Sequence, residues 1–62
     1  MKFLCDGRWL SAEEFEEWIA DMSIYDLAEM SCESKYYTMQ MLEASETLED
    51  KAQILGIETR IA

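Results

Sequence analysis

The sequence predicts one small, mainly α-helical domain of three to four short helices. A short N-terminal β-hairpin or extended arm precedes the helices, and a C-terminal strand remains an open alternative. Half of the 62 residues are hydrophobic, proline is absent, and glycine occurs only at Gly7 and Gly56. Serine or threonine precedes three runs of helix-forming residues, where a hydroxyl can cap the helix N-terminus. A chain of this length forms one domain at most, so we assign residues 1–62 to a single acidic domain.

Residues 2–10, KFLCDGRWL, predict the hairpin. Asp6-Gly7 suits a type I′ turn, in which both central residues have positive φ. The flanking runs are short, so the hairpin needs a neighbour to be stable. A plain turn that leads into the first helix is the alternative.

Residues 11–22 predict the first helix. Ser11 and Glu14 have the spacing of a capping box, in which each side chain accepts a hydrogen bond from the other residue's backbone N–H. Four large apolar residues follow at helical spacing and predict a stripe that faces the core: Phe15, Trp18, Ile19 and Met22.

Two further helices are expected in the middle of the chain. Ser23 caps a helix that begins at Ile24, and a break is expected in residues 31–34, SCES, because serine side chains compete for backbone hydrogen bonds. Residues 35–44 then favour a helix. A strand over the Tyr/Met-rich part is the alternative, because Tyr37, Met39 and Met41 alternate.

The last helix and the tail have their own end signals. Thr47 caps a helix over residues 48–55, and Gly56 with Ile57 suits a Schellman ending. Residues 57–62, IETRIA, alternate in polarity, which indicates either a strand added to the hairpin or a frayed end.

Residues 47–62, TLEDKAQILGIETRIA, resemble the first helix and turn of a helix-turn-helix module, with Ala52, Leu55, Gly56 and Ile57 in the corresponding positions. This resemblance implies that a DNA-recognition helix follows the turn. The charged residues of the segment do not form a basic face: Glu49, Asp50, Lys51, Glu58 and Arg60. Direct nucleic-acid binding is therefore not expected.

Composition argues against an enzyme, a metal site and a cofactor. The chain has no histidine, which is the commonest general base and metal ligand. Cys5 and Cys32 cannot supply the usual four zinc ligands, and two distant glycines cannot form a phosphate-binding loop. We expect Cys32 to be a small core residue rather than a nucleophile.

No stretch approaches the roughly 20 apolar residues that span a membrane. The apolar run near the N-terminus is too short for a signal peptide. We therefore expect a cytoplasmic protein, in which the two cysteines are reduced thiols.

The net charge is −9, and it is concentrated in one part of the chain. This charge disfavours nucleic acid and anionic membranes as partners and favours a basic protein. Residues 11–34 contain eight carboxylates and no Lys or Arg: Glu13, Glu14, Glu16, Glu17, Asp21, Asp26, Glu29 and Glu33.

Three like-charge pairs within this segment have i, i+4 spacing, and each costs about 0.2–0.5 kcal/mol. A domain of this size has only about 3–5 kcal/mol of stability. One interpretation is that the acidic face keeps an apolar-rich protein soluble. The other is that it matches a basic groove of a partner that normally holds nucleic acid. Small acidic nucleic-acid mimics of this kind are typical of phages, where they inhibit host nucleases or act as anti-CRISPR proteins.

Residues 36–42 form a second unusual region, because their tyrosine, methionine and leucine side chains spread around most of a helical wheel. The helix is then either central in the fold, a self-association surface or a hot spot for another protein. Our leading hypothesis is a non-enzymatic inhibitor or adaptor, and the alternative is a homo-oligomeric structural or regulatory protein such as a homodimer. The candidate partner-binding residues are Glu13, Glu16, Glu17, Asp21, Asp26, Glu29, Glu33, Tyr36, Tyr37 and Met39.

Overall fold

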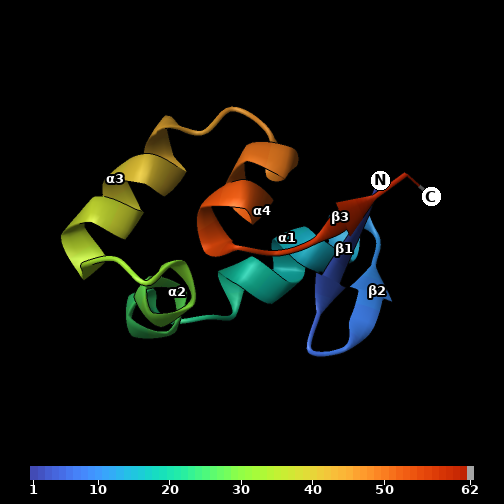
Figure 1. The fold of residues 1–62 in the computed structure, drawn as a ribbon, viewed down its shortest axis with the longest axis horizontal. Coiled ribbons are helices and arrows are strands. Elements are labelled where there is room, and N and C mark those ends of the chain that lie inside the picture. Colours follow the sequence, from blue (N-terminus) through green and yellow to red (C-terminus); the bar gives the residue numbers. More distant parts are fainter. Residues whose placement is uncertain (62) are drawn as a thin grey trace.

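Within residues 1–61, four short helices and a three-stranded antiparallel sheet make up the fold, with the sheet built from both ends of this range (Figure 1). The computed structural model describes residues 1–61. The elements are, in chain order, β1 (Lys2–Cys5), β2 (Arg8–Leu10), α1 (Ala12–Ala20), α2 (Ile24–Ser31), α3 (Lys35–Ala44), α4 (Leu48–Leu55) and β3 (Thr59–Arg60). The prediction of a mainly α fold with an N-terminal hairpin is confirmed.

The sheet has the order β2-β1-β3, so β1 is its central strand. Phe3 of β1 lies opposite Leu10 of β2 on one side and opposite Thr59 of β3 on the other. Asp6 and Gly7 have φ values of 51° and 78°, as a type I′ turn requires. The hairpin and the C-terminal strand are therefore both confirmed, and each stabilises the other through β1.

Each helix begins after a hydroxyl residue whose side-chain oxygen accepts the backbone N–H three residues further on. These residues are Ser11, Ser23, Ser34 and Thr47. The capping box is complete, because the Ser11 N–H donates to Glu14 Oε1 at 2.9 Å and the Glu14 N–H donates to Ser11 Oγ at 3.3 Å. Helices of eight to ten residues are marginal alone, so these caps fix where each one starts.

Two residues in the left-handed conformation end α2 and α4. Cys32, with φ 60°, ends α2, and Gly56, with φ 72°, ends α4. The Ile57 N–H donates to the Ala52 carbonyl at 2.8 Å, which completes the predicted Schellman ending. The break expected in residues 31–34 is confirmed.

The chain continues as a strand after Gly56, not as a second helix. The Leu4 N–H donates to the Glu58 carbonyl at 2.9 Å, and this bond leads directly into the β1–β3 pairing. The resemblance to a helix-turn-helix module therefore ends at the turn, and no recognition helix follows within residues 1–61.

The main core lies between the sheet, α1 and α4. Its buried residues are Phe3, Cys5, Leu10, Phe15 and Ala52. The rings of Phe3 and Phe15 are stacked, with centroids 4.2 Å apart. Burying one such side chain contributes about 1.5–3 kcal/mol. This pair therefore fixes α1 on the hairpin.

A smaller contact joins α2, α3 and α4 at the opposite end of the molecule, and Thr38 is its fully buried member on α3. The hydroxyls of Ser31 and Thr38 are 2.7 Å apart, and Ser31 Oγ donates to the Ala28 carbonyl at 3.0 Å. Within residues 1–61, every buried side-chain nitrogen or oxygen has a hydrogen-bond partner. This polar contact fixes α3 against α2.

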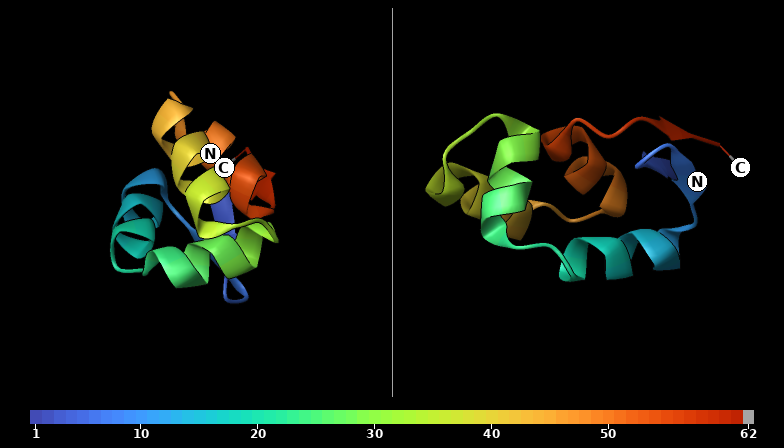
Figure 2. Two further views of the ribbon diagram at one scale, coloured as in Figure 1. Left: turned by 90° about the vertical axis from the view of Figure 1, so that its left-hand side faces the viewer. Right: turned by 90° about the horizontal axis from the view of Figure 1, so that it is seen from below.

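Three predictions about the middle of the chain are wrong. The strand alternative over residues 35–42 fails, because α3 is a regular helix. A buried central helix fails as well, because α3 lies at the end of the molecule far from the sheet (Figures 1 and 2), where few elements cover it. Cys32 is exposed rather than buried in the core, because it occupies the turn between α2 and α3. Cys32 and the buried Cys5 are both free thiols.

Candidate functional site

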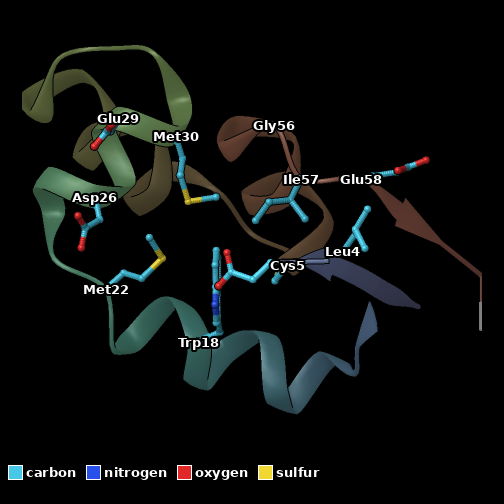
Figure 3. A pocket seen from close by; sticks show the side chains of 11 residues that line it. Leu4, Cys5, Trp18, Met22, Asp26, Glu29, Met30, Gly56, Ile57 and Glu58 are labelled. Carbon is cyan, nitrogen blue, oxygen red and sulfur yellow. The ribbon is translucent and has the colours of Figure 1, made fainter. Parts of the chain in front are cut away.

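An open groove of about 680 Å³ lies between α1, α2, β1 and the segment that follows α4 (Figure 3). Its apolar floor is made by Leu4, Trp18, Met22, Met30 and Ile57. Its acidic rim is made by Asp6, Asp26, Glu29 and Glu58. Among the described residues that line the groove, none is basic. The groove therefore combines an apolar surface with a strongly negative border.

The floor exists because α1 has more apolar surface than the sheet covers. Phe15 is completely buried against Phe3, whereas Trp18 and Met22 are only half-buried. The C-terminal part of α1 runs past the end of the sheet, and Met30 of α2 faces Trp18 across the resulting space (Figure 3). The sequence predicts that the apolar stripe faces the core. Trp18 and Ile19 do pack against the core while staying partly exposed, whereas Met22 lies beyond the end of α1 and lines the groove.

The rim carboxylates come from both sides of the groove. Asp26 and Glu29 are exposed on α2, while Glu58 is exposed on the opposite side (Figure 3). The hydrogen bond from the Leu4 N–H to the Glu58 carbonyl fixes the backbone from which the Glu58 side chain projects. A ligand in the groove therefore meets negative charge on two sides.

The outer side of α1 continues the negative surface. Glu13, Glu17 and Asp21 follow one another at i, i+4 spacing on the side away from the buried Phe15, and all three are exposed. Glu14 differs, because it accepts the Ser11 backbone N–H, which lowers the pKa of its carboxyl. Glu13, Glu17 and Asp21, which we call the α1 ridge, thus project into solvent without the capping function that explains Glu14.

The five basic residues all lie outside residues 11–34. Two of them rest on aromatic rings: Lys35 Nζ lies 4.2 Å from the centre of the Tyr25 ring, and Arg60 Cζ lies 4.3 Å from the centre of the Trp9 ring. The outer surface of α1, together with the α2 side of the groove, therefore carries the concentrated negative charge of the molecule.

The exposed surface of α3 is a separate apolar region. Its large side chains have exposed fractions of 75% for Tyr36, 47% for Tyr37, 49% for Met39 and 38% for Met41. Tyr37 and Met41 border a shallow hollow against Ile54 of α4, and Met39 borders another on the side of α2. Thus α3 offers apolar surface on two flanks and does not form one face.

All ten sequence-predicted binding residues are exposed, but the structure does not bring them into one site. Asp26 and Glu29 line the groove, and Glu33 lies with Tyr37 in the hollow beside α4. The other acidic residues lie on α1, at Glu13, Glu16 and Glu17, and at its C-cap, Asp21. Tyr36 and Met39 remain on α3.

Sequence reasoning missed several lining residues of the groove: Leu4, Asp6, Trp18, Met22, Met30, Ile57 and Glu58. A signal for Trp18 and Met22 was present, because four large apolar residues between residues 15 and 22 are more than short strands can cover. Asp6 and Glu58 give no such signal, since only the fold brings them to the groove.

The groove contains a thiol group. Cys5 lines it, but burial raises the pKa of its thiol and the neighbouring Asp6 raises it further, so the nucleophilic thiolate is disfavoured. Within residues 1–61, no group of three His, Cys, Asp or Glu side chains is arranged to hold a metal ion. None of the helices in the described part of the chain is long and apolar enough to cross a membrane.

Comparisons with protein-family models, curated proteins and solved structures give no match for this chain.

Proposed function

We propose that this chain is a non-enzymatic binding module that docks on a basic surface of a partner protein, as an inhibitor or an adaptor. The supporting observation is the negative surface of α1 and α2, which is exposed and adjoins an apolar groove. A solubilising face needs charge alone. A negative surface beside a groove floored by Trp18, Met22 and Met30 also offers the apolar contact that gives an interface its affinity.

The size of the molecule strengthens this proposal. Its accessible surface is 4401 Å², and a standard protein interface takes about 800 Å² from each partner. Such an interface would cover roughly a fifth of the molecule. If it includes the groove, it also includes Asp26 and Glu29, and α1 lies next to it. A partner that uses this side would therefore need basic residues opposite these carboxylates.

A basic protein groove of this kind commonly holds nucleic acid, because phosphate contacts require Lys and Arg. An acidic chain in that groove would exclude the nucleic acid. On this basis we propose nucleases and CRISPR complexes as the target class. Electrostatic steering would make the association fast and would weaken it at high salt.

The proposal is tested by capture of partners from the lysate of the source cell, at low and at high salt. Glu17→Lys with Asp21→Lys should abolish capture, because both residues lie in the α1 ridge. Glu43→Lys with Glu46→Lys is the matched control, since it changes the net charge equally at exposed positions outside α1 and α2. Equal loss with both pairs, or retention with the first pair, contradicts the proposal.

Self-association through α3 is the second candidate function. The specific observation is that residues 35–42 contain one Lys and no carboxylate, while large tyrosine and methionine side chains there are exposed. Two chains that each carry a net charge of −9 repel one another. This repulsion is weakest when the chains meet at α3, so a homodimer is most favourable at this surface.

Sedimentation over a range of concentrations tests this second function. A dimer that is lost in Tyr37→Ser with Met41→Ser supports it, because both side chains flank the same hollow. Tyr36→Ser is a useful comparison, since Tyr36 is more exposed and points elsewhere on the helix. A monomer at all concentrations contradicts the proposal.

A further inference from the structure

We infer that the groove binds an amphipathic helix of the partner, with a stripe of apolar residues that is flanked on both sides by Lys or Arg. This inference rests on the proposed function, because it specifies the part of the basic partner that the groove receives. It follows from the floor, the rim and the position of β1, each of which restricts the chemistry of the occupant.

The floor selects apolar side chains. Trp18 is half-buried and gives a large rigid surface, while Met22 and Met30 have flexible, polarisable side chains that fill irregular spaces. Apolar residues of an incoming helix can insert among these three side chains. Such a contact would remove the exposed part of Trp18 from water.

The rim selects positive charge beside the apolar stripe. Asp26 and Glu29 lie on the α2 side, and Glu58 lies on the side of the sheet (Figure 3). A helix that lies between them needs Lys or Arg on both flanks of its apolar face. A nucleic acid is disfavoured, because its phosphates would face these carboxylates.

The sheet excludes the main alternative way of binding a peptide. An extended peptide binds by adding a strand to an exposed sheet edge. The strand that borders the groove is β1. Its edge toward β2 is paired from Phe3 to Cys5, and its other edge is paired with β3 at Lys2 and Phe3 and bonded to the Glu58 carbonyl through the Leu4 N–H. The unpaired edge beside the groove is therefore limited to the end of β1 after the Leu4 N–H, which is too short to pair with an added strand. The walls of the groove are the helices α1 and α2, which suits a helix-in-groove contact.

Trp18 provides an internal reporter for the test. The chain has two tryptophans, and Trp9 lies under Arg60 on the hairpin instead of in the groove. In a Trp9→Phe background, Trp18 is the remaining indole. The probe is a synthetic helical peptide with leucine on one face and lysine on both flanks. The comparison peptide has the same lysines, with serine in place of each leucine.

The amphipathic peptide should shift the Trp18 emission to shorter wavelength, and the serine peptide should bind much more weakly. Asp26→Asn with Glu29→Gln should weaken binding of the amphipathic peptide about tenfold, the effect of two exposed ion pairs. Glu43→Gln with Glu46→Gln removes the same charge at exposed positions outside α1, α2 and the groove, and it should change affinity less than about twofold.

Met30→Gln in the floor gives a second, uncharged test, and circular dichroism checks that the variant remains folded. Met30→Gln should weaken binding of the amphipathic peptide and leave the weak binding of the serine peptide unchanged. Equal binding of the two peptides, or equal weakening by the rim pair and the Glu43/Glu46 pair, overturns the groove inference and leaves a charge-based interaction with a basic partner intact. Absence of a Trp18 shift at any peptide concentration overturns the inference as well, whereas the proposed function is decided separately by the partner capture.

Discussion

Glu17→Gln should stabilise the protein, even though it removes a side chain that we assign to the binding surface. Glu17 lies between Glu13 and Asp21, with i, i+4 spacing to each, and all three are exposed on α1. Glutamine and glutamate have similar helix propensities, so the substitution mainly removes charge repulsion. Two like-charge pairs at this spacing cost about 0.4–1 kcal/mol together.

This gain corresponds to a rise in Tm of about 2–8 °C for a domain of this size. Thermal unfolding followed by circular dichroism at low salt measures it directly. In 1 M salt the Debye length falls to about 3 Å, so the difference between variant and wild type should largely disappear.

Glu14→Gln is the matched control, one helical turn earlier on the same helix. Glu14 accepts the Ser11 N–H in the capping box and lies at the helix N-terminus, where the dipole favours negative charge. The same substitution should therefore lower stability at this position. A loss of stability in Glu17→Gln, or an equal gain in Glu14→Gln, would refute the view that the ridge carries unrelieved repulsion.

Three further predictions concern single contacts. Ser31→Ala should lower the free energy of unfolding, measured in urea, by about 1–3 kcal/mol, because it leaves the buried Thr38 hydroxyl without a partner. Thr38→Val should lower it by only about 0.5–1.5 kcal/mol. The opposite order would contradict the packing of α3 on α2. Iodoacetamide at neutral pH should label the exposed Cys32 while Cys5 remains unmodified in the folded state, as mass spectrometry can show; comparable labelling would contradict the burial of Cys5. The hydrogen bond from the Ser11 N–H holds the pKa of Glu14 below its ordinary 4.5, so the stability that Glu14 contributes is present above pH 4.5 and is lost as the pH falls through the lowered value. The difference in unfolding free energy between wild type and Glu14→Gln should therefore shrink on acidification. A growing difference would contradict the assignment.

Local signals explain most of the fold. The hydroxyl of Ser11, the Asp6-Gly7 turn and the Gly56 ending each act within a few residues of sequence, and the structure contains all three as expected. Caps and tight turns satisfy the hydrogen bonds of backbone groups nearby in the chain, so a short stretch of sequence is enough to predict them. Ser34 also caps a helix. The sequence predicts a break in residues 31–34, but it does not identify Ser34 as the cap of the helix that follows.

The errors have a different origin, because they depend on which surface a distant segment covers. The spacing of Trp18 and Met22 correctly indicates the apolar side of α1, but the coverage of that side depends on the length of the sheet. For the same reason, the sequence shows that α3 has apolar side chains all round without showing that the helix lies at the end of the molecule. Cys32 was expected inside because cysteine is usually buried, yet its turn position exposes it.

The candidate site was predictable only in its charge. The concentration of carboxylates in residues 11–34 is a property of the sequence, and the structure places them in exposed positions. The groove beside them forms where β1, α1, α2 and the segment after α4 meet, and it includes Glu58 from the far end of the chain. Such a long-range meeting of elements has no signature in local periodicity.

The most direct test of the binding surface is to map it on the labelled protein in complex with its captured partner. Amide chemical shifts of the ¹⁵N-labelled chain report which residues the partner contacts. We expect the largest changes on α1, on α2 and around Trp18 and Met30, with α3 nearly unchanged. Changes confined to α3, with the carboxylates of α1 and α2 still facing solvent, would contradict the assignment of the acidic surface as the binding site.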